Sequence, residues 1–268
     1  MYVLLLCFGA LAGVTTVLFG FGGGFVVVPV LYSVLLATYG ADSGMGQAAM
    51  HIAVATSTAV MIFGAGLATL RHHKAGTVPW AQVRPLLASI AVGAVPGAAA
   101  AMALSGGWVR WAFIVYLGVT ILDGLLRPGF TRHTASGIRP LGKRATVGIG
   151  VVIGAIAAFL GVGGSVMTVP LMRRRGASMT AATAAANPLS LPMAVAGSAT
   201  YALLAWDAAP LGDWHAGFID LRACLALAAG SWLGIRITSR WIGKIPDSVH
   251  AKTYLVLLCA VLVVMLAV

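Results

Sequence analysis

Ten apolar segments occupy most of this 268-residue chain, and a polar stretch at 127–146 separates the first five from the last five. They cover residues 1–19, 25–38, 46–69, 83–104 and 108–126, then 147–160, 165–172, 179–205, 218–235 and 252–268. The composition agrees, because 60% of the residues are hydrophobic, 9% are charged and the mean hydropathy is +0.98. A chain this apolar cannot cover a water-facing surface, so the sequence predicts an all-α polytopic membrane protein and excludes most soluble enzymes.

The chain also contains an internal repeat, and its clearest part is a glycine-rich motif. Residues 20–29 (GFGGGFVVVP) match residues 161–170 (GVGGSVMTVP) at a constant offset of 141. The match resumes at an offset of 133, where residues 54–57 correspond to residues 187–190. We therefore predict a first repeat at 1–126, a basic cytoplasmic loop at 127–146 and a second repeat at 147–268.

Two of the apolar segments, 147–160 and 165–172, are short for membrane crossings. A helix needs roughly 20 residues to span a hydrocarbon core of about 30 Å. The economical interpretation is a re-entrant hairpin of two half-helices, and two full but tilted crossings are the alternative. The repeat extends this prediction to the first half, so each half would be a Gly-rich helical hairpin followed by three transmembrane helices.

The basic residues predict how the chain is oriented, because cytoplasmic loops carry an excess of Lys and Arg. With the stretch 127–146 placed inside, 15 of the 17 basic residues fall on the cytoplasmic side. Four acids, Asp42, Asp207, Asp213 and Asp220, fall on the other side. Each repeat then crosses the membrane an odd number of times, so the halves are predicted to be inverted. Both termini are predicted outside a bacterial inner membrane, and the net charge of +11 reflects orientation rather than a nucleic-acid partner.

Paired broken hairpins predict a transport site, since secondary transporters bind substrate near the midplane between inverted repeats. The second half-helix of each hairpin is predicted to begin at Gly24 or Ser165, where free N–H groups and the positive helix end would attract an anion. Glycine at 22, 23, 163 and 164 permits positive φ and leaves these groups uncovered. The predicted substrate-binding residues of the tips are Gly22, Gly23, Gly24, Phe25, Gly163, Gly164 and Ser165. Close helix packing is the alternative role for the glycines.

The third apolar segment of each half supplies further polar groups at membrane depth. Thr56 and Ser57 in the first half, and Asn187 and Ser190 in the second, are also predicted to bind substrate. The alternative is that these side chains bond back to their own helices. No Lys or Arg lies in the middle of a segment, so the anion would be bound by dipoles, N–H groups and hydroxyls.

Prolines within these segments are predicted to alter the helices, because proline removes an N–H donor and clashes with the preceding turn. Pro29 and Pro170 would kink the half-helices. Pro188, together with Pro192, would break the third helix of the second half and free its carbonyl groups.

Few titratable groups are available for coupling transport to an ion gradient. His51 and Asp123 are the candidates near the membrane interior, although Asp123 can equally form an interfacial ion pair with Arg127, four residues away. The adjacent His72 and His73 are predicted to be solvated in a basic loop.

The paired G-x-G-G-[GS]-x(4)-P motifs, each followed by a helix that bears Ser or Thr, resemble the sulfite exporter TauE/SafE family of membrane permeases. The resemblance covers the whole chain. It implies a transporter that exports small sulfur-containing anions, such as sulfite or organosulfonates, with residues 22–24 and 163–165 lining the anion site. Because substrates vary within the family, another small anion is an open alternative. Ser165, which stands where the first motif has Gly24, would add a hydroxyl donor.

Two other functions lack the features that they need. A membrane-embedded enzyme is disfavoured because the chain has no Glu, no H-E-x-x-H and no suitable G-x-S-x-G motif. An assembly subunit would not need polar hairpins at the midplane. We expect no enzymatic activity, no cofactor, no resident metal and no nucleic-acid partner. The expected partners are the small sulfur oxyanion or sulfonate and the lipid bilayer.

Overall fold

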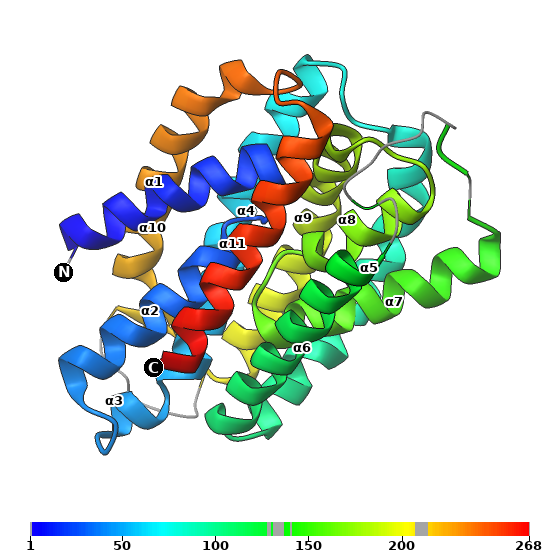
Figure 1. Ribbon diagram of the computed structural model, residues 1–268. Helices are drawn as coiled ribbons and strands as arrows, with labels where there is room; N and C mark the ends of the chain where they lie inside the picture. The colour runs from blue at the N-terminus through cyan, green and yellow to red at the C-terminus, as the bar shows by residue number, and fades with distance from the viewer. Residues whose placement is uncertain (1, 128–129, 131–136, 140, 207–213, 268) are drawn as a thin grey trace.

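The structure, a computed structural model, describes residues 2–127, 130, 137–139, 141–206 and 214–267, and these fold almost entirely as helices (Figure 1). The first half contains α1 (Tyr2–Phe19), α2 (Gly24–Tyr39), α3 (Gly44–Gln47), α4 (Ala49–Lys74), α5 (Trp80–Ala103) and α6 (Gly106–Leu126). The second half contains α7 (Lys143–Leu160), α8 (Ser165–Arg174), α9 (Met179–Leu204), α10 (Leu221–Thr238), the 3-10 helix η1 (Ser239–Trp241) and α11 (Asp247–Ala267). Strands β1 (His215–Ala216) and β2 (Ile219–Asp220) pair antiparallel before α10.

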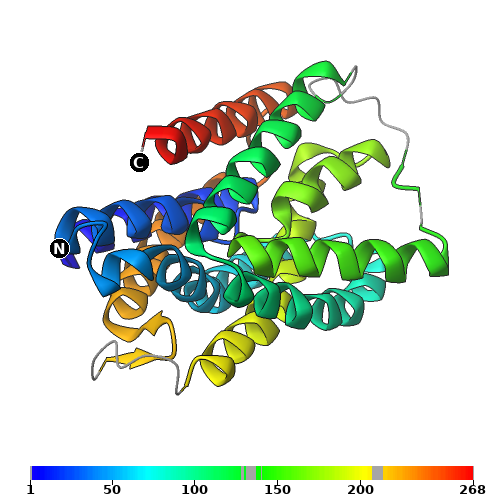
Figure 2. The same ribbon diagram turned by 90° about the horizontal axis from the view of Figure 1, so that it is seen from below.

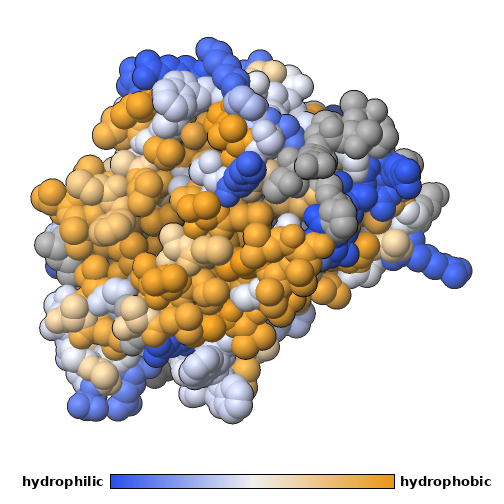
Figure 3. All heavy atoms as spheres, in the orientation of Figure 1, coloured by the Kyte–Doolittle hydropathy of each residue, from blue (hydrophilic) through white to orange (hydrophobic). Residues whose placement is uncertain are grey.

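Several helices are suited to a membrane. In the described part of the chain, α1, α4, α5, α6, α10 with η1, and α11 are long and apolar enough to cross one. Apolar residues cover a broad area of the surface, while hydrophilic residues gather towards its edges (Figure 3). Exposed large side chains such as Val92, Trp108 and Leu225 need a lipid environment. The prediction of an all-α polytopic membrane protein is confirmed.

Four helices pack in two close pairs, α1 against α10 and α7 against α5. Each of the four carries a G-x-x-x-G pattern, formed by Gly9 and Gly13, Gly93 and Gly97, Gly150 and Gly154, or Gly230 and Gly234. A Cβ on Gly13 would lie 2.2 Å from the carbonyl oxygen of Ser231, and one on Gly97 would lie 2.1 Å from that of Ala155. The backbones therefore touch, as in small-residue packing between membrane helices.

The contacts define two ends of the molecule. At the end that we call the basic end, Arg173 of α8 pairs with Asp247 at the start of α11, and Arg174 pairs with Asp123 near the end of α6. At the opposite end, Arg110 near the start of α6 donates to the Met265 carbonyl near the end of α11. In Figures 1 and 2 both termini lie on one side and the first turn of α7 on the other.

The two helical hairpins, α1–α2 and α7–α8, run in opposite directions. Gly9 faces Leu227 and Gly13 faces Ser231, so α1 is parallel to α10 and begins at the opposite end. Gly93 faces Val151, and α7 is parallel to α5, which begins at the basic end. This is the arrangement that an inverted repeat requires, although inversion across a membrane stays a prediction, as do the boundaries of the two repeats. Three of the charged residues on which the predicted orientation rests lie outside the described residues: Arg132, Asp207 and Asp213.

The prolines do not end their helices. The predicted break at Pro188 and Pro192 is wrong, because α9 is continuous from Met179 to Leu204. Although each proline removes one helical hydrogen bond, α9 is packed along α4, α5 and α8, and this burial keeps the flanking turns in place. Pro29, Pro170 and Pro188 lie inside α2, α8 and α9, and the kinks expected at these three prolines stay a prediction.

Candidate anion site at the hairpin tips

The tips of the two hairpins meet at the centre of the molecule, where loop 20–23 contacts loop 161–164. A Cβ on Gly22 would lie 3.3 Å from the Cα of Gly163, and one on Gly24 would lie 2.4 Å from the carbonyl oxygen of Gly161. Every residue of both loops is buried. Glycine is required because only a residue without a side chain allows two backbones to approach this closely.

The second arm of each hairpin begins where the sequence predicts, at Gly24 for α2 and at Ser165 for α8. The predicted positive φ is confirmed for Gly22 (+67°) and Gly23 (+90°). It is wrong for Gly163 and Gly164, because in the second loop the left-handed residue is Gly161 (φ +65°), which caps the end of α7. Gly163 instead provides space for the neighbouring loop.

Backbone N–H groups at both tips lack hydrogen-bond acceptors. Within the described residues, no acceptor is found for the N–H groups of Gly22, Gly23, Gly24 and Phe25, nor for those of Gly163, Gly164, Ser165 and Val166. Buried backbone donors are nearly always paired in folded proteins, so such a concentration calls for an explanation. These donors stand at two helix N-termini, where the helix dipole adds positive potential.

Side chains from α4 and α9 complete the site. The Ser57 hydroxyl donates to the Gly161 carbonyl at 2.8 Å and thereby joins α4 to the second hairpin. Asn187 is fully buried; its Nδ2 atom donates to the Thr183 carbonyl of its own helix at 3.4 Å, and its Oδ1 atom has no hydrogen-bond partner among the described residues. The Ser190 hydroxyl donates back to the Ala186 carbonyl of its own helix, which is the alternative given from the sequence. The same hydroxyl lies against the second loop, since a Cβ on Gly163 would be 2.9 Å from its oxygen. The Ser165 hydroxyl lies 3.5 Å from the Gly163 carbonyl and is also fully buried.

Thr56 is the predicted binding residue that the structure does not bring to the tips. Its hydroxyl accepts a hydrogen bond from the N–H of Asp220 at 2.9 Å, so it faces the start of α10. The neighbouring Thr58 bonds back to Val54 of its own helix at 2.7 Å. Of this threonine and serine cluster, only Ser57 hydrogen-bonds to a hairpin.

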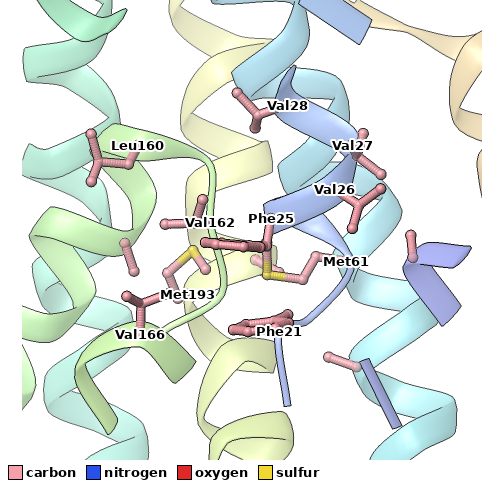
Figure 4. Close-up of a cluster of buried hydrophobic side chains, with 14 of the residues drawn as sticks. Phe21, Phe25, Val26, Val27, Val28, Met61, Leu160, Val162, Val166 and Met193 are labelled. Carbon is pink, nitrogen blue, oxygen red and sulfur yellow. The ribbon is translucent and has the colours of Figure 1, made fainter. Parts of the chain in front are cut away.

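Apolar side chains close the space between the tips. Figure 4 shows Phe25 between Val162 and Met61, with Phe21 beside Met61. The rings of Phe21 and Phe25 stack at 4.4 Å between centroids. These side chains and the polar groups around them are buried, so the candidate site is closed to solvent in this structure.

The two candidates for ion coupling lie far from each other, at opposite ends of the molecule. His51 contacts the carbonyls of Ala101 and Leu104 through Nε2, at 3.1 and 3.0 Å. Asp123 forms the expected ion pair with Arg127 and a second pair with Arg174 at 2.8 Å. Neither reaches the tips, and a coupling role for each stays a prediction.

A cavity of about 310 Å³ lies between α6, α7 and α8. Asp123 and Arg174 line it at the basic end, and Ile153 and Val166 line it beside the second hairpin. Ile153 lies next to the tip, since its Cγ2 atom would be 3.2 Å from a Cβ on Gly164. The cavity thus leads from the basic end towards the candidate site, and no sequence motif indicated it.

Two buried histidines were also missed. His72 was predicted to be solvated, which is wrong: it is 2% exposed and lies on α4. His250 of α11 is 4% exposed. Each binds a carbonyl at the end of α1, close to the first tip. The run Arg71-His72-His73-Lys74 has the composition of a loop, and so its second residue gave no sign of burial.

Membrane-spanning helices around two helical hairpins define a polytopic membrane protein, and the comparisons with known proteins identify its class as a membrane transporter rather than an enzyme. The chain belongs to the sulfite exporter TauE/SafE family, whose model matches residues 5–265. It is 26% identical over 269 residues to a "Probable membrane transporter protein" of Haemophilus influenzae, covering 96% of each chain. It is 27% identical to a "Probable membrane transporter protein MamO" of Magnetospirillum gryphiswaldense over 78% of this chain and 37% of that protein. The comparison with solved structures finds no match.

Proposed function

We propose that the protein is a secondary transporter that exports small sulfur-containing anions, such as sulfite or organosulfonates, across the bacterial inner membrane. The observation that carries this proposal is the set of unpartnered, buried N–H groups at the two touching tips. An oxyanion accepts several hydrogen bonds at once and is favoured at helix N-termini. The family supports the choice of a sulfur oxyanion.

The chemistry of the tips suits transport rather than tight storage. The side chains that hydrogen-bond to the tips or lie against them include the uncharged Ser57 and Ser190. N–H groups and hydroxyls can replace part of the hydration shell of an anion without the long-range attraction of a fixed cation. An anion bound in this way can also leave when the site opens to water.

The cavity between α6, α7 and α8 would be the entry route. The positive-inside rule places the basic end in the cytoplasm, so the cavity would open to the compartment from which an exporter loads. Arg174, whose side chain is half exposed, would attract anions to the mouth. Rocking of the two inverted halves, 1–126 and 147–268, would then expose the tips to each side in turn.

Flux into liposomes tests the proposal. Purified protein is reconstituted and screened with sulfite, sulfate, thiosulfate, taurine and sulfoacetate, which also identifies the preferred anion. Gly164→Leu is expected to abolish flux, because its side chain would enter the tip beside Ile153. Gly148→Leu is the matched control and should retain flux, since nothing lies within 4 Å of the position that a Cβ on Gly148 of α7 would occupy. Absence of flux with every oxyanion would contradict the proposal.

The coupling ion is tested in the same liposomes. If His51 or Asp123 carries a coupled proton, an imposed proton gradient should change the flux, and His51→Gln or Asp123→Asn should remove that response. Flux that is indifferent to the gradient excludes a coupling role for both residues.

A further inference from the structure

The last turn of α1, the first helix of the first hairpin, is hydrogen-bonded to two imidazole rings. The Nε2 atom of His72 lies 2.7 Å from the carbonyl oxygen of Val17, and the Nε2 atom of His250 lies 2.7 Å from that of Leu18. A carbonyl can only accept, so both Nε2 atoms carry a proton and donate. They supply partners for carbonyls of the last turn of α1, which the helix itself cannot satisfy. These two hydrogen bonds, which we call the histidine clamp, therefore lie just before Gly20, where the tip begins.

The second hairpin has a cap at the equivalent position, made with different chemistry. The Tyr201 hydroxyl donates to the Ala158 carbonyl at 2.8 Å. Ala158 corresponds to Val17 at the offset of 141, and Tyr201 lies near the end of α9 as His72 lies near the end of α4. Histidine gains or loses a proton close to neutral pH, whereas tyrosine ordinarily does so near pH 10. The first hairpin is therefore held by groups whose ordinary titration range is close to neutral pH, and the second by a group whose ordinary range is far from it.

A proton added to the second nitrogen would find a hydrogen-bond acceptor on His72 but none on His250 within the described residues. His72 Nδ1 lies 2.8 Å from the Thr77 hydroxyl, which is itself 3.2 Å from the His72 carbonyl. When Nδ1 is neutral the hydroxyl donates to it; when Nδ1 is protonated it donates to the hydroxyl, which turns its hydrogen to the carbonyl. His250 Nδ1 is buried and has no partner within the described residues.

The charges around the clamp come from three elements. Asp247 of α11 and Arg173 of α8 act on His250, and the two histidines act on each other. Tyr254, one turn beyond His250, contributes a buried hydroxyl. The last turn of α1 presents carbonyls, apolar side chains and the Thr16 hydroxyl, which bonds back to the Ala12 carbonyl. Burial is the largest influence and disfavours a positive charge on either ring; Arg173 adds to this effect at His250, and Asp247 opposes it without reversing the balance.

We propose that His72 and His250, as neutral imidazoles, hold the first hairpin in its occluded position and release it when a proton binds. A proton added to Nδ1 of either ring would place a positive charge in a buried site, where His250 Nδ1 has no acceptor within the described residues and Arg173 lies nearby. Movement of α1 away from the imidazoles lets water reach the charged form, so proton binding and hairpin position are linked. This inference rests on the proposed transport function, since the linkage would couple the proton to export.

Amide hydrogen exchange of the protein in lipid nanodiscs tests the clamp without any substrate. After correction for intrinsic exchange, we expect protection of residues 20–25 to fall roughly ten-fold between pH 8 and pH 6, because the opened state takes up protons that burial excludes from the closed state. The double variant His72→Gln, His250→Gln keeps two amide donors but cannot titrate, so its protection should not change with pH. Each single variant should show a reduced pH response, which keeps the test valid if the double variant does not fold.

Tyr201→Phe is the matched control on the second hairpin. It should increase exchange of residues 159–165 by the same factor at every pH. Wild-type protection that is independent of pH, or a pH response that survives in the double variant, would overturn the proposal. Because no substrate is present, these outcomes are separate from the liposome flux: loss of the pH response with flux intact refutes the proton site alone, and absence of flux with the pH response intact refutes the transport function alone.

Discussion

Replacing Gly154 by Ala should destabilise the protein, although alanine is the better helix former. A Cβ at this position would lie 2.0 Å from the carbonyl oxygen of Ile90 on α5, whereas ordinary contacts begin at 3.4 Å. The obstacle is backbone, so no side-chain rotation relieves it, and α5 and α7 must separate by about 1.4 Å. Overpacking costs about 1–3 kcal/mol, and helix propensity returns at most about 1 kcal/mol. We expect a net loss of about 2 kcal/mol.

The control lies on the same helix. Gly148 of α7 has nothing within 4 Å of its Cβ position, so Gly148→Ala should leave the free energy of unfolding unchanged or raise it by up to about 1 kcal/mol. Both variants are unfolded reversibly in mixed micelles and followed by tryptophan fluorescence. Gly13→Ala, at the equivalent position of α1, should behave like Gly154→Ala. A Gly154→Ala protein as stable as the wild type would refute the close backbone contact.

Three further predictions concern the tips, the basic end and the topology. Ser57→Ala removes the bond to the Gly161 carbonyl, so amide exchange at residues 161–165 should rise roughly 5- to 150-fold. Thr58→Val loses only a bond within α4 and should change this exchange little; equal effects of the two variants would contradict a role of Ser57 in joining α4 to the second hairpin. Asp123→Asn should lower the free energy of unfolding by no more than about 1 kcal/mol, and by less at high salt, because its ion pairs are partly exposed. A loss above about 3 kcal/mol would contradict the description of these ion pairs as weak surface contacts. A cysteine at Ser136, in the predicted cytoplasmic loop, should resist an impermeant thiol reagent added outside the cell.

The hairpins could be predicted from sequence because their cause is local. Glycines in a short link between apolar segments specify where a helix must stop, and the repeat then identifies the same link twice. The starts of α2 at Gly24 and α8 at Ser165 were predicted correctly for this reason. The G-x-x-x-G pairs were equally visible, since Gly9 and Gly13 match Gly150 and Gly154 at the same offset of 141, but their partners on α10 and α5 follow only from the packing.

Other features depend on contacts between distant segments. Thr56 and Ser57 are neighbours, yet their hydroxyls bond to Asp220 and Gly161 because they face different helices. His72 is buried because the end of α1 reaches it, a contact that bridges 55 residues of sequence. The continuity of α9 likewise comes from the helices that enclose it. Composition and spacing describe a helix and its faces, whereas the neighbour on each face is decided by the tertiary structure.

The two hairpins are equivalent by sequence but are not held equally. The short second arm α8 ends in Arg173, which binds Asp247 and the carbonyl of Ala177, and Arg174, which binds Asp123. The second arm of the first hairpin, α2, contains no charged residue at all. Local opening is easiest where the fewest strong contacts must break. We therefore expect the first hairpin to open more easily than the second, and His72 and His250, which bond to the end of α1, lie where a single proton would have the greatest influence on whether the tips stay closed.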